Sequence, residues 1–121
     1  MHNRFRALIM DMDGVLVDSE PVHGRAWERV LAGLGVPCAP DWFLAWVGIP
    51  DWALAEHLAA SGTVNLSADA LVMRKRRIYR THAPEELRAF DGVAEGLGRL
   101  NGMLRAVATT SGREDAHLAL D

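Results

Sequence analysis

Two short apolar runs and the helical segment between them predict an α/β fold, a doubly wound parallel sheet with an inserted all-helical domain. Residues 5–10 and 103–109 have the length and composition of central parallel strands. Parallel strands need a crossover connection, and helices must cover both faces of their sheet. With 121 residues, 50% of them hydrophobic, the chain can supply one ordinary core.

The first helix is predicted from the stretch "PVHGRAWERVLAGLG", where apolar residues recur at helical spacing. Pro21 stands in its first turn and Gly35 at its end, as is typical of helix boundaries. Four further segments carry helical patterns: residues 41–48, 51–62, 67–82 and 93–100.

Capping signals set the expected ends of these helices. Asp41, Asp51 and Ser67 are N-cap candidates. The helix that begins at Ser67 is expected to stop before Pro84, because proline is incompatible with a helix interior. Three tryptophans are expected in the core of the helical domain: Trp42, Trp46 and Trp52.

The pattern divides the chain into two parts. Residues 1–15 and 86–121 are assigned to a partial α/β core, and residues 16–85 to the inserted helical domain. The boundaries fall in "DSEP" and "HAPEELRAFDG", where Pro and Gly interrupt the helical pattern.

An acidic pair follows the first strand in "ALIMDMDGVLVDSEP". Asp11 and Asp13 are two positions apart, so both side chains point the same way on an extended segment while Met12 turns into the protein. Ligands of open parallel sheets bind at the carboxyl ends of the strands. Two carboxylates there suit Mg²⁺, which draws in phosphate oxygens, and a carboxylate can itself attack phosphorus. Gly14 permits a turn and lets its amide approach an anion.

The composition of the chain indicates which binding partners and which cellular compartment to expect. A net charge of −3 gives no reason to expect nucleic acid or an anionic membrane as partner. No apolar run approaches about 18 residues, and the opening "MHNRFRALIM" lacks the cleavage site of a secretory signal. Cys38 is the single cysteine, which argues against a disulfide framework and fits a reducing compartment, so a cytoplasmic location is expected.

Two stretches carry a family resemblance: "DMDGVLVDSEP" resembles the first motif of the haloacid dehalogenase-like phosphohydrolases, and "AVATTSGR" resembles their second. The resemblance implies a Rossmann-like core with a helical cap. It also implies that Asp11 is the nucleophile, that Asp13 is the general acid and base, and that Asp11 and the main-chain carbonyl of Asp13 hold Mg²⁺. Thr109 would hydrogen-bond the transferring phosphoryl group, with the amides of Thr110 and Gly14 as helpers.

The cap of this family selects substrates, so the resemblance points to residues there as well. His23 and Trp27 lie one turn apart in "HGRAW", a pairing found in sugar-phosphate members. The sequence leaves two roles open for each of these residues. His23 either packs at the hinge of the cap or contacts the substrate, and Trp27 either lies in the core or contacts the substrate. The stretch "WVGIPDW" stands where the family carries a specificity loop, which makes Trp46, Gly48 and Ile49 candidates.

Two downstream motifs of the family, a Lys or Arg and an acidic residue, have no match in the sequence. The sole lysine, Lys75, lies in the cap region, and neither Asp115 nor Asp121 follows an apolar strand. The chain therefore resembles the amino-terminal part of a longer phosphohydrolase, with an incomplete sheet, and is expected to be inactive alone. The basic run from Arg74 to Arg77, with Arg80, is expected to be a solvated helix face, with attraction of a phosphorylated substrate as the alternative.

The resemblance implies a magnesium-dependent phosphatase of small phosphorylated metabolites, either phosphoglycolate or sugar phosphates, that works through an aspartyl-phosphate. A phosphomutase similar to beta-phosphoglucomutase is the runner-up, because the mutase holds a second phosphate with an Arg where this sequence has Asp51. A non-catalytic module that binds phosphate or a partner is the alternative of another class. The oligomeric state is open.

Overall fold

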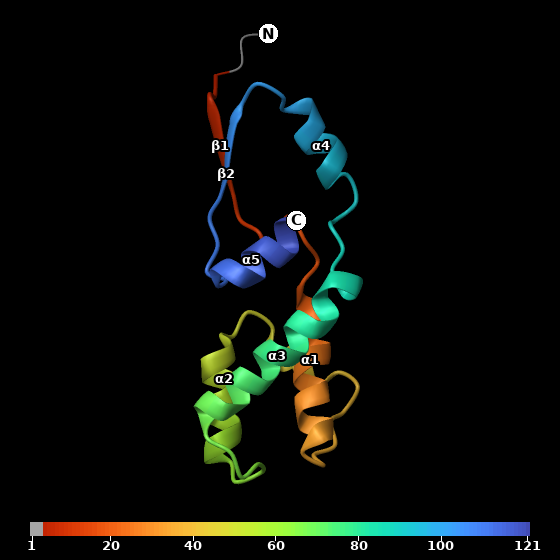
Figure 1. Ribbon diagram of the computed structural model, residues 1–121, viewed down its shortest axis with the longest axis vertical. Coiled ribbons are helices and arrows are strands. Elements are labelled where there is room, and N and C mark those ends of the chain that lie inside the picture. The colour runs from red at the N-terminus through yellow and green to blue at the C-terminus, as the bar shows by residue number, and fades with distance from the viewer. Residues whose placement is uncertain (1–3) are drawn as a thin grey trace.

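The computed structural model describes residues 4–121, so the first three residues of the predicted 1–15 segment lie outside it. The elements follow in the order β1 (Ala7–Met10), α1 (Glu20–Gly33), η1 (Trp42–Trp46), α2 (Asp51–Ala60), α3 (Ala68–Glu86), α4 (Val93–Arg99), β2 (Leu104–Val107) and α5 (Arg113–Leu120). The two strands lie side by side at one end of the elongated molecule, and α1, α2 and α3 pack together at the other (Figure 1). We call residues 20–86 the helical insertion.

The predicted parallel pair is confirmed. β1 pairs with β2 in parallel, with Ala7 opposite Leu104 and Met10 opposite Val107. Both strands therefore end at the same edge, and α5 lies beside that edge (Figure 1). The residues after β1 form a small core of their own, made by Met12, Leu16 and Val17 and covered by Ala116 and Ala119 of α5.

The first helix begins and ends where the sequence predicts. Ser19 is its N-cap and Pro21 stands in its first turn. At the other end Gly35 adopts a φ of +74°, and the amide of Val36 donates to the carbonyl of Leu31 over 2.9 Å. A left-handed glycine with this bond is a Schellman motif, and it turns Val36 back onto the helical core.

The core of the helical insertion lies where α1, α2 and α3 meet, and its members are Trp27, Val30, Leu31, Leu54, Ala55, Leu58, Val64 and Leu71. Trp42 and Trp46 pack against this cluster and are partly buried. The prediction for Trp52 is wrong, because its side chain is 61% exposed. Trp52 directly follows the first residue of α2 and lies on the outer face of that helix.

Three predicted helix details are also wrong. The segment from Trp42 to Trp46 is a 3₁₀ helix, held by bonds such as the one from the Leu44 amide to the Asp41 carbonyl. Asp51 is the first residue of α2 and not its N-cap, which is Pro50. The third helix continues through Pro84 to Glu86, which costs few backbone bonds because only the last turn lies beyond the proline.

Two connecting segments, residues 16–18 and 88–90, join the helical insertion to the strands. The Asp18 amide donates to the Arg88 carbonyl over 2.8 Å, and the Phe90 amide donates to the Leu16 carbonyl over 3.1 Å. The entry and exit of the insertion therefore run side by side as a short two-stranded connection, bridged at Val17.

Arg80 forms a further link, because its guanidinium bonds to Glu114 over 2.7 Å and to Asp115 over 3.0 Å, both in the first turn of α5. The hydrogen bond to Asp115 raises the pKa of Arg80. Arg80 is thus engaged with α5 and is not part of a freely solvated helix face. No helix among residues 4–121 has the length and apolar character needed to cross a membrane.

Glu86, at the end of α3, forms ion pairs with α1. These ion pairs make the stability of the fold depend on pH. Arg25 and Arg29 both donate to its carboxylate, and the hydrogen bond from Arg29 is the main reason that its pKa is lowered to about 2. A carboxylate with a lowered folded-state pKa stabilises the fold above its ordinary pKa of 4.5, and this contribution disappears as the pH falls toward about 2.

We therefore expect wild-type protein to be more stable than Glu86→Gln at neutral pH, and the difference to shrink between about pH 5 and about pH 2. The urea unfolding midpoints of both proteins, taken between about pH 5 and about pH 2, measure this difference in stability. Both proteins contain the other acidic groups and His23, so the difference between them reports on Glu86 and its partners Arg25, Arg29 and His82. A difference that stays constant down to about pH 2 would contradict the ion pair.

Candidate functional site

The acidic pair lies at the carboxyl end of β1. Asp11 is exposed, and its Oδ1 accepts a hydrogen bond from the Met12 amide over 2.8 Å. Met12 is 1% exposed, which confirms that it turns into the protein. Asp13 is half-buried and accepts two side-chain bonds, from Ser19 Oγ to Oδ1 and from Ser111 Oγ to Oδ2, each over 2.6 Å.

Gly14 makes the turn that follows. Its φ of +77° lies in the left-handed region that favours glycine. Its amide, however, donates to the carbonyl of Val17 over 2.9 Å, so this group is not free to meet an anion. In this conformation Gly14 therefore serves the turn, and the role of its amide in phosphate binding stays a prediction.

The second polar loop, which follows β2, meets the first loop at the sheet edge. Thr109 is partly buried, and its Oγ1 accepts a hydrogen bond from the Ser111 amide over 3.1 Å. Its own hydroxyl proton remains available for a ligand. Thr110 is exposed beside it. The bond from Ser111 to Asp13 joins the two loops, which are 98 positions apart along the chain.

Ser19 and Ser111 are the residues of this site that sequence reasoning missed. Both were visible as hydroxyls inside the two motif stretches, in "DSEP" and "TTSGR". What the sequence does not show is that the two hydroxyls converge on one carboxylate.

A second polar cluster lies inside the helical insertion, around Lys75. This side chain is 2% exposed, so the prediction of a solvated run is wrong at Lys75. Its ammonium donates to Asp51 Oδ2 over 2.7 Å, contacts His23 Nδ1 over 2.6 Å and lies 5.0 Å from the centre of the Tyr79 ring. Asp51 also accepts a bond of 3.1 Å from the Trp27 indole. The charge of the buried ammonium is therefore balanced by Asp51.

His23 is part of this cluster in its neutral form. Burial is the main cause, and the nearby Lys75 charge the second, of a lowering of its pKa to about 4. Its ring stacks on Tyr79 with centroids 4.3 Å apart. Because an ammonium only donates, Nδ1 must accept, and the ring proton lies on Nε2.

Four other residues of the helical insertion are candidates for contact with a substrate. One of them is buried, and three lie at or near the surface. Trp27 is fully buried in the core of the helical insertion, which supports the core position among its two alternatives, and its contact with a substrate stays a prediction. Trp46 is half-buried, with its ring 4.8 Å from that of His57. Gly48 and Ile49 are exposed and accessible to a ligand.

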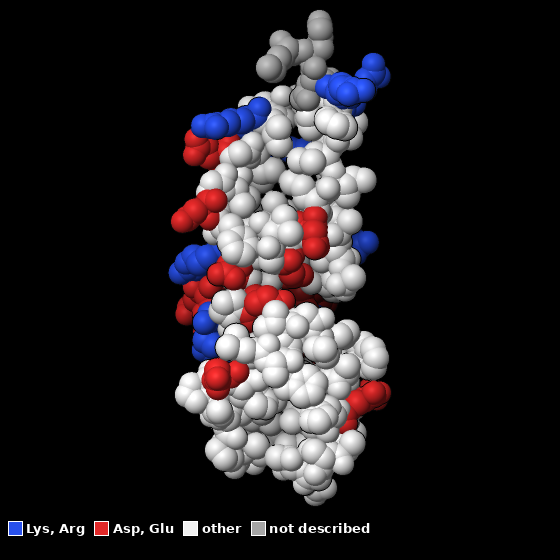
Figure 2. Space-filling view, turned by 180° about the vertical axis from the view of Figure 1, so that it is seen from behind, with Lys and Arg blue, Asp and Glu red and all other residues white. Residues whose placement is uncertain are grey.

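Negative charge dominates the region between the sheet and the helical insertion. Figure 2 shows acidic side chains gathered across the middle of one face. Burial first, and the charge of Asp13 second, raise the pKa of Glu20 there. Among residues 4–121, no Lys or Arg side chain is bonded to Asp11 or Asp13, and no group of three or more acidic, His or Cys side chains is arranged to hold a metal ion.

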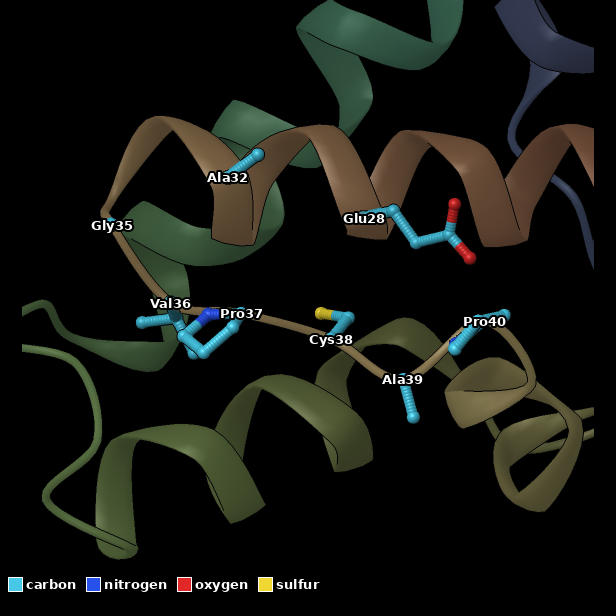
Figure 3. A pocket seen from close by; sticks show the side chains of 8 residues that line it. All are labelled: Glu28, Ala32, Gly35, Val36, Pro37, Cys38, Ala39 and Pro40. Carbon is cyan, nitrogen blue, oxygen red and sulfur yellow. The ribbon is translucent and has the colours of Figure 1, made fainter.

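Two cavities lie along α1, and neither has Asp11 or Asp13 in its wall. The larger, of about 790 Å³, lies between α1 and residues 35–40, with Glu28 as its only charged lining residue (Figure 3). Cys38 faces it, and burial raises the pKa of this thiol. The smaller, of about 380 Å³, lies between α1 and η1 and has Asp18 and Glu20 in its wall.

The parallel pair, the polar loops at its carboxyl edge and the helices inserted between the strands define a class of α/β proteins that place their ligands at that edge. The profile of the haloacid dehalogenase-like hydrolases matches residues 8–121, and the chain belongs to this family.

Named relatives support this membership. The chain is 32% identical over 119 residues to the fructose-1-phosphate phosphatase YqaB of Escherichia coli, covering 96% of this chain and 61% of the relative. It is 29% identical over 104 residues to the phosphoglycolate phosphatase of Thiobacillus denitrificans, covering 81% and 45%. The structure of a candidate beta-phosphoglucomutase from Thermotoga maritima superposes with a TM-score of 0.79 at 28% identity, covering 96% of this chain and 55% of that one. The chain thus spans about half to three fifths of the length of these relatives.

Proposed function

We propose that the full protein is a magnesium-dependent phosphatase of small phosphorylated metabolites that works through an aspartyl-phosphate on Asp11. The observation that carries the proposal is the junction of the two loops at one sheet edge, where Ser111 bonds to Asp13 beside Thr109. The phosphatase names of the two sequence relatives support the same reaction class. A sugar phosphate or phosphoglycolate is the proposed substrate, and the cytoplasm the proposed location, since Cys38 is a free thiol.

Asp11 and Asp13 offer oxygen atoms that fit a hard divalent cation, and they would supply part of its ligand set. Asp11 offers an exposed carboxylate, and the Asp13 carbonyl accepts no backbone hydrogen bond in the described part of the chain. Mg²⁺ commonly takes one or two carboxylates together with waters and phosphate oxygens. When bound by these two groups, the ion would supply positive charge to the phosphate, which no described Lys or Arg supplies.

Asp11 and Asp13 are proposed to divide the chemistry. An oxygen of Asp11 forms a bond to phosphorus while the bond from phosphorus to the leaving oxygen breaks, and Asp13 gives that oxygen its proton. Asp13 then takes a proton from water, whose oxygen attacks the phosphorus and releases Asp11. The Thr109 hydroxyl donates a hydrogen bond to a phosphoryl oxygen.

The proposal is tested by phosphate release from a panel of esters that includes fructose 1-phosphate and phosphoglycolate, with and without Mg²⁺. We expect turnover that EDTA abolishes and Mg²⁺ restores. Absence of turnover with every ester, in a full protein shown to be folded, would favour the alternative of a non-catalytic binding module.

Asp13→Asn is expected to slow turnover most for alkyl phosphates, because their alkoxide must receive a proton as it leaves. The loss should be about 100-fold or more for alkyl esters and smaller for aryl esters, whose leaving groups need little help. Steady-state kcat for both ester types measures this. Equal losses on both would contradict the acid role of Asp13.

A phosphomutase is the second candidate, favoured by the likeness to the Thermotoga maritima structure. At the position where the mutase is expected to carry an Arg, Asp51 accepts bonds from Lys75 and Trp27 and adds negative charge. This weakens the case for a second phosphate site. Conversion of a hexose 1-phosphate to its 6-phosphate, without net phosphate release, would reverse the ranking.

A further inference from the structure

The carboxylate of Asp13 is held at both oxygens. Ser19 donates to Oδ1 and Ser111 to Oδ2, both at 2.6 Å. Hydroxyl bonds to a carboxylate of this length are among the stronger hydrogen bonds in proteins. The two donors come from different parts of the molecule, one at the start of the helical insertion and one after β2.

The Ser19 side chain bonds to Asp13 and does not cap its own helix. It is the N-cap of α1, a position at which serine normally accepts a bond from its own helix, yet its side chain makes no such bond. Its side chain is completely buried and its hydroxyl points to Asp13 instead. A fully buried residue that departs from its local preference is expected where a functional group must be positioned.

Ser111 connects Asp13 to the proposed phosphoryl-binding residue. Its hydroxyl bonds to Asp13 while its amide donates to Thr109 Oγ1 over 3.1 Å. One residue therefore fixes both the carboxylate and the threonine relative to each other. Unlike Ser19, it is only partly buried and lies in the loop itself.

We propose that Ser111 is a positioning residue for Asp13: its hydroxyl turns Oδ2 toward the loop that carries Thr109. The inference rests on the proposed function, because orientation matters only if Asp13 exchanges a proton with a substrate bound there. A general acid acts only within hydrogen-bond reach of the atom it serves, so a carboxylate free to rotate is a poorer acid.

The test compares Ser111→Ala, Ser111→Thr and the control Ser61→Ala in the full protein. Ser61 donates its hydroxyl to the Leu58 carbonyl in the helical insertion, so its loss removes a hydroxyl of the same kind away from Asp13. The readouts are kcat and KM on a primary alkyl phosphate and on p-nitrophenyl phosphate, together with the melting temperature.

For Ser111→Ala we expect kcat on the alkyl ester to fall about 10-fold to 100-fold, with a smaller fall on the aryl ester and KM changed by less than about 3-fold. Ser111→Thr retains a hydroxyl and should restore most of the loss. Ser61→Ala should behave as wild type on both esters.

Three results would overturn the inference while leaving the proposed function intact: unchanged kcat on the alkyl ester, equal losses on both esters, or a raised KM at unchanged kcat. A wild-type protein that hydrolyses neither ester would instead refute the proposed function, and the role of Ser111 with it. The two failures are thus told apart by the wild-type activity.

Discussion

Asp11→Asn is expected to lower magnesium-dependent phosphate release by on the order of 1,000-fold or more, the scale on which loss of a nucleophile acts in other enzymes. Asn has the same shape as Asp and keeps an oxygen that can accept the Met12 amide, so the local backbone should be retained. It lacks the charge and nucleophilicity that attack on phosphorus needs. Phosphate release at saturating ester, with the melting temperature as a check on folding, measures the effect.

Asp91→Asn is the matched control. Asp91 is exposed in the turn before α4, so the same change of charge should leave turnover unaltered. If Asp11→Asn keeps more than about one tenth of wild-type turnover, another group is the nucleophile.

Trp27→Ala is expected to destabilise the protein by about 3–5 kcal/mol, the usual cost of removing a large buried aromatic side chain. Trp27 is fully buried at the contact of α1 with the other helices, and its indole N–H is bonded to Asp51. The cavity and the loss of one partner of Asp51 act in the same direction. Thermal and urea unfolding of both proteins measure the loss.

Trp52→Ala removes the same side chain from an exposed site and should change stability by less than about 0.5 kcal/mol. Trp27→Phe keeps an aromatic ring and should unfold between wild type and Trp27→Ala, which covers the case in which Trp27→Ala does not fold. A loss for Trp52→Ala as large as that for Trp27→Ala would contradict the burial of the two residues.

The elements could be predicted because they depend on short-range patterns, and the parallel pairing because two apolar runs separated by helices favour a crossover connection. Apolar runs mark β1 and β2, and Pro21 and Gly35 mark the ends of α1. The end of α3 could not be read in this way. Its last turn continues beyond Pro84 because Glu86 is held by two arginines far away in the sequence, and no local signal reports that contact.

The interior of the helical insertion was harder to predict than its helices. Lys75 lies in a basic run, but it is four residues from Leu71 and from Tyr79, and all three are buried on one face of α3. That spacing is the signal that could have shown it to be buried. Its partner Asp51 looked like a capping residue, because sequence alone does not show that a carboxylate at a helix start has a buried ammonium within reach.

The acidic pair itself was placed correctly at the end of β1, while its catalytic and metal-binding roles stay predictions. The family motifs identify which residues stand there, and parallel pairing fixes the edge. The two serines on Asp13 depend on how the loops meet, which is a tertiary property.

The pairing of β1 with β2 also has a consequence for the order in which the protein folds. Asp13 and Ser111 are 98 positions apart, whereas the helical insertion is one continuous segment between them. Contacts between distant segments form late, because closing a long loop costs more entropy than closing a short one. During synthesis, the helices can pack before β2 has left the ribosome, and β1 cannot pair until β2 has been made. We expect the amides of β1 and β2 to exchange with solvent faster than those in the middle of α1 and α3, so that the acidic pair lies in the part of the molecule that forms last and opens first.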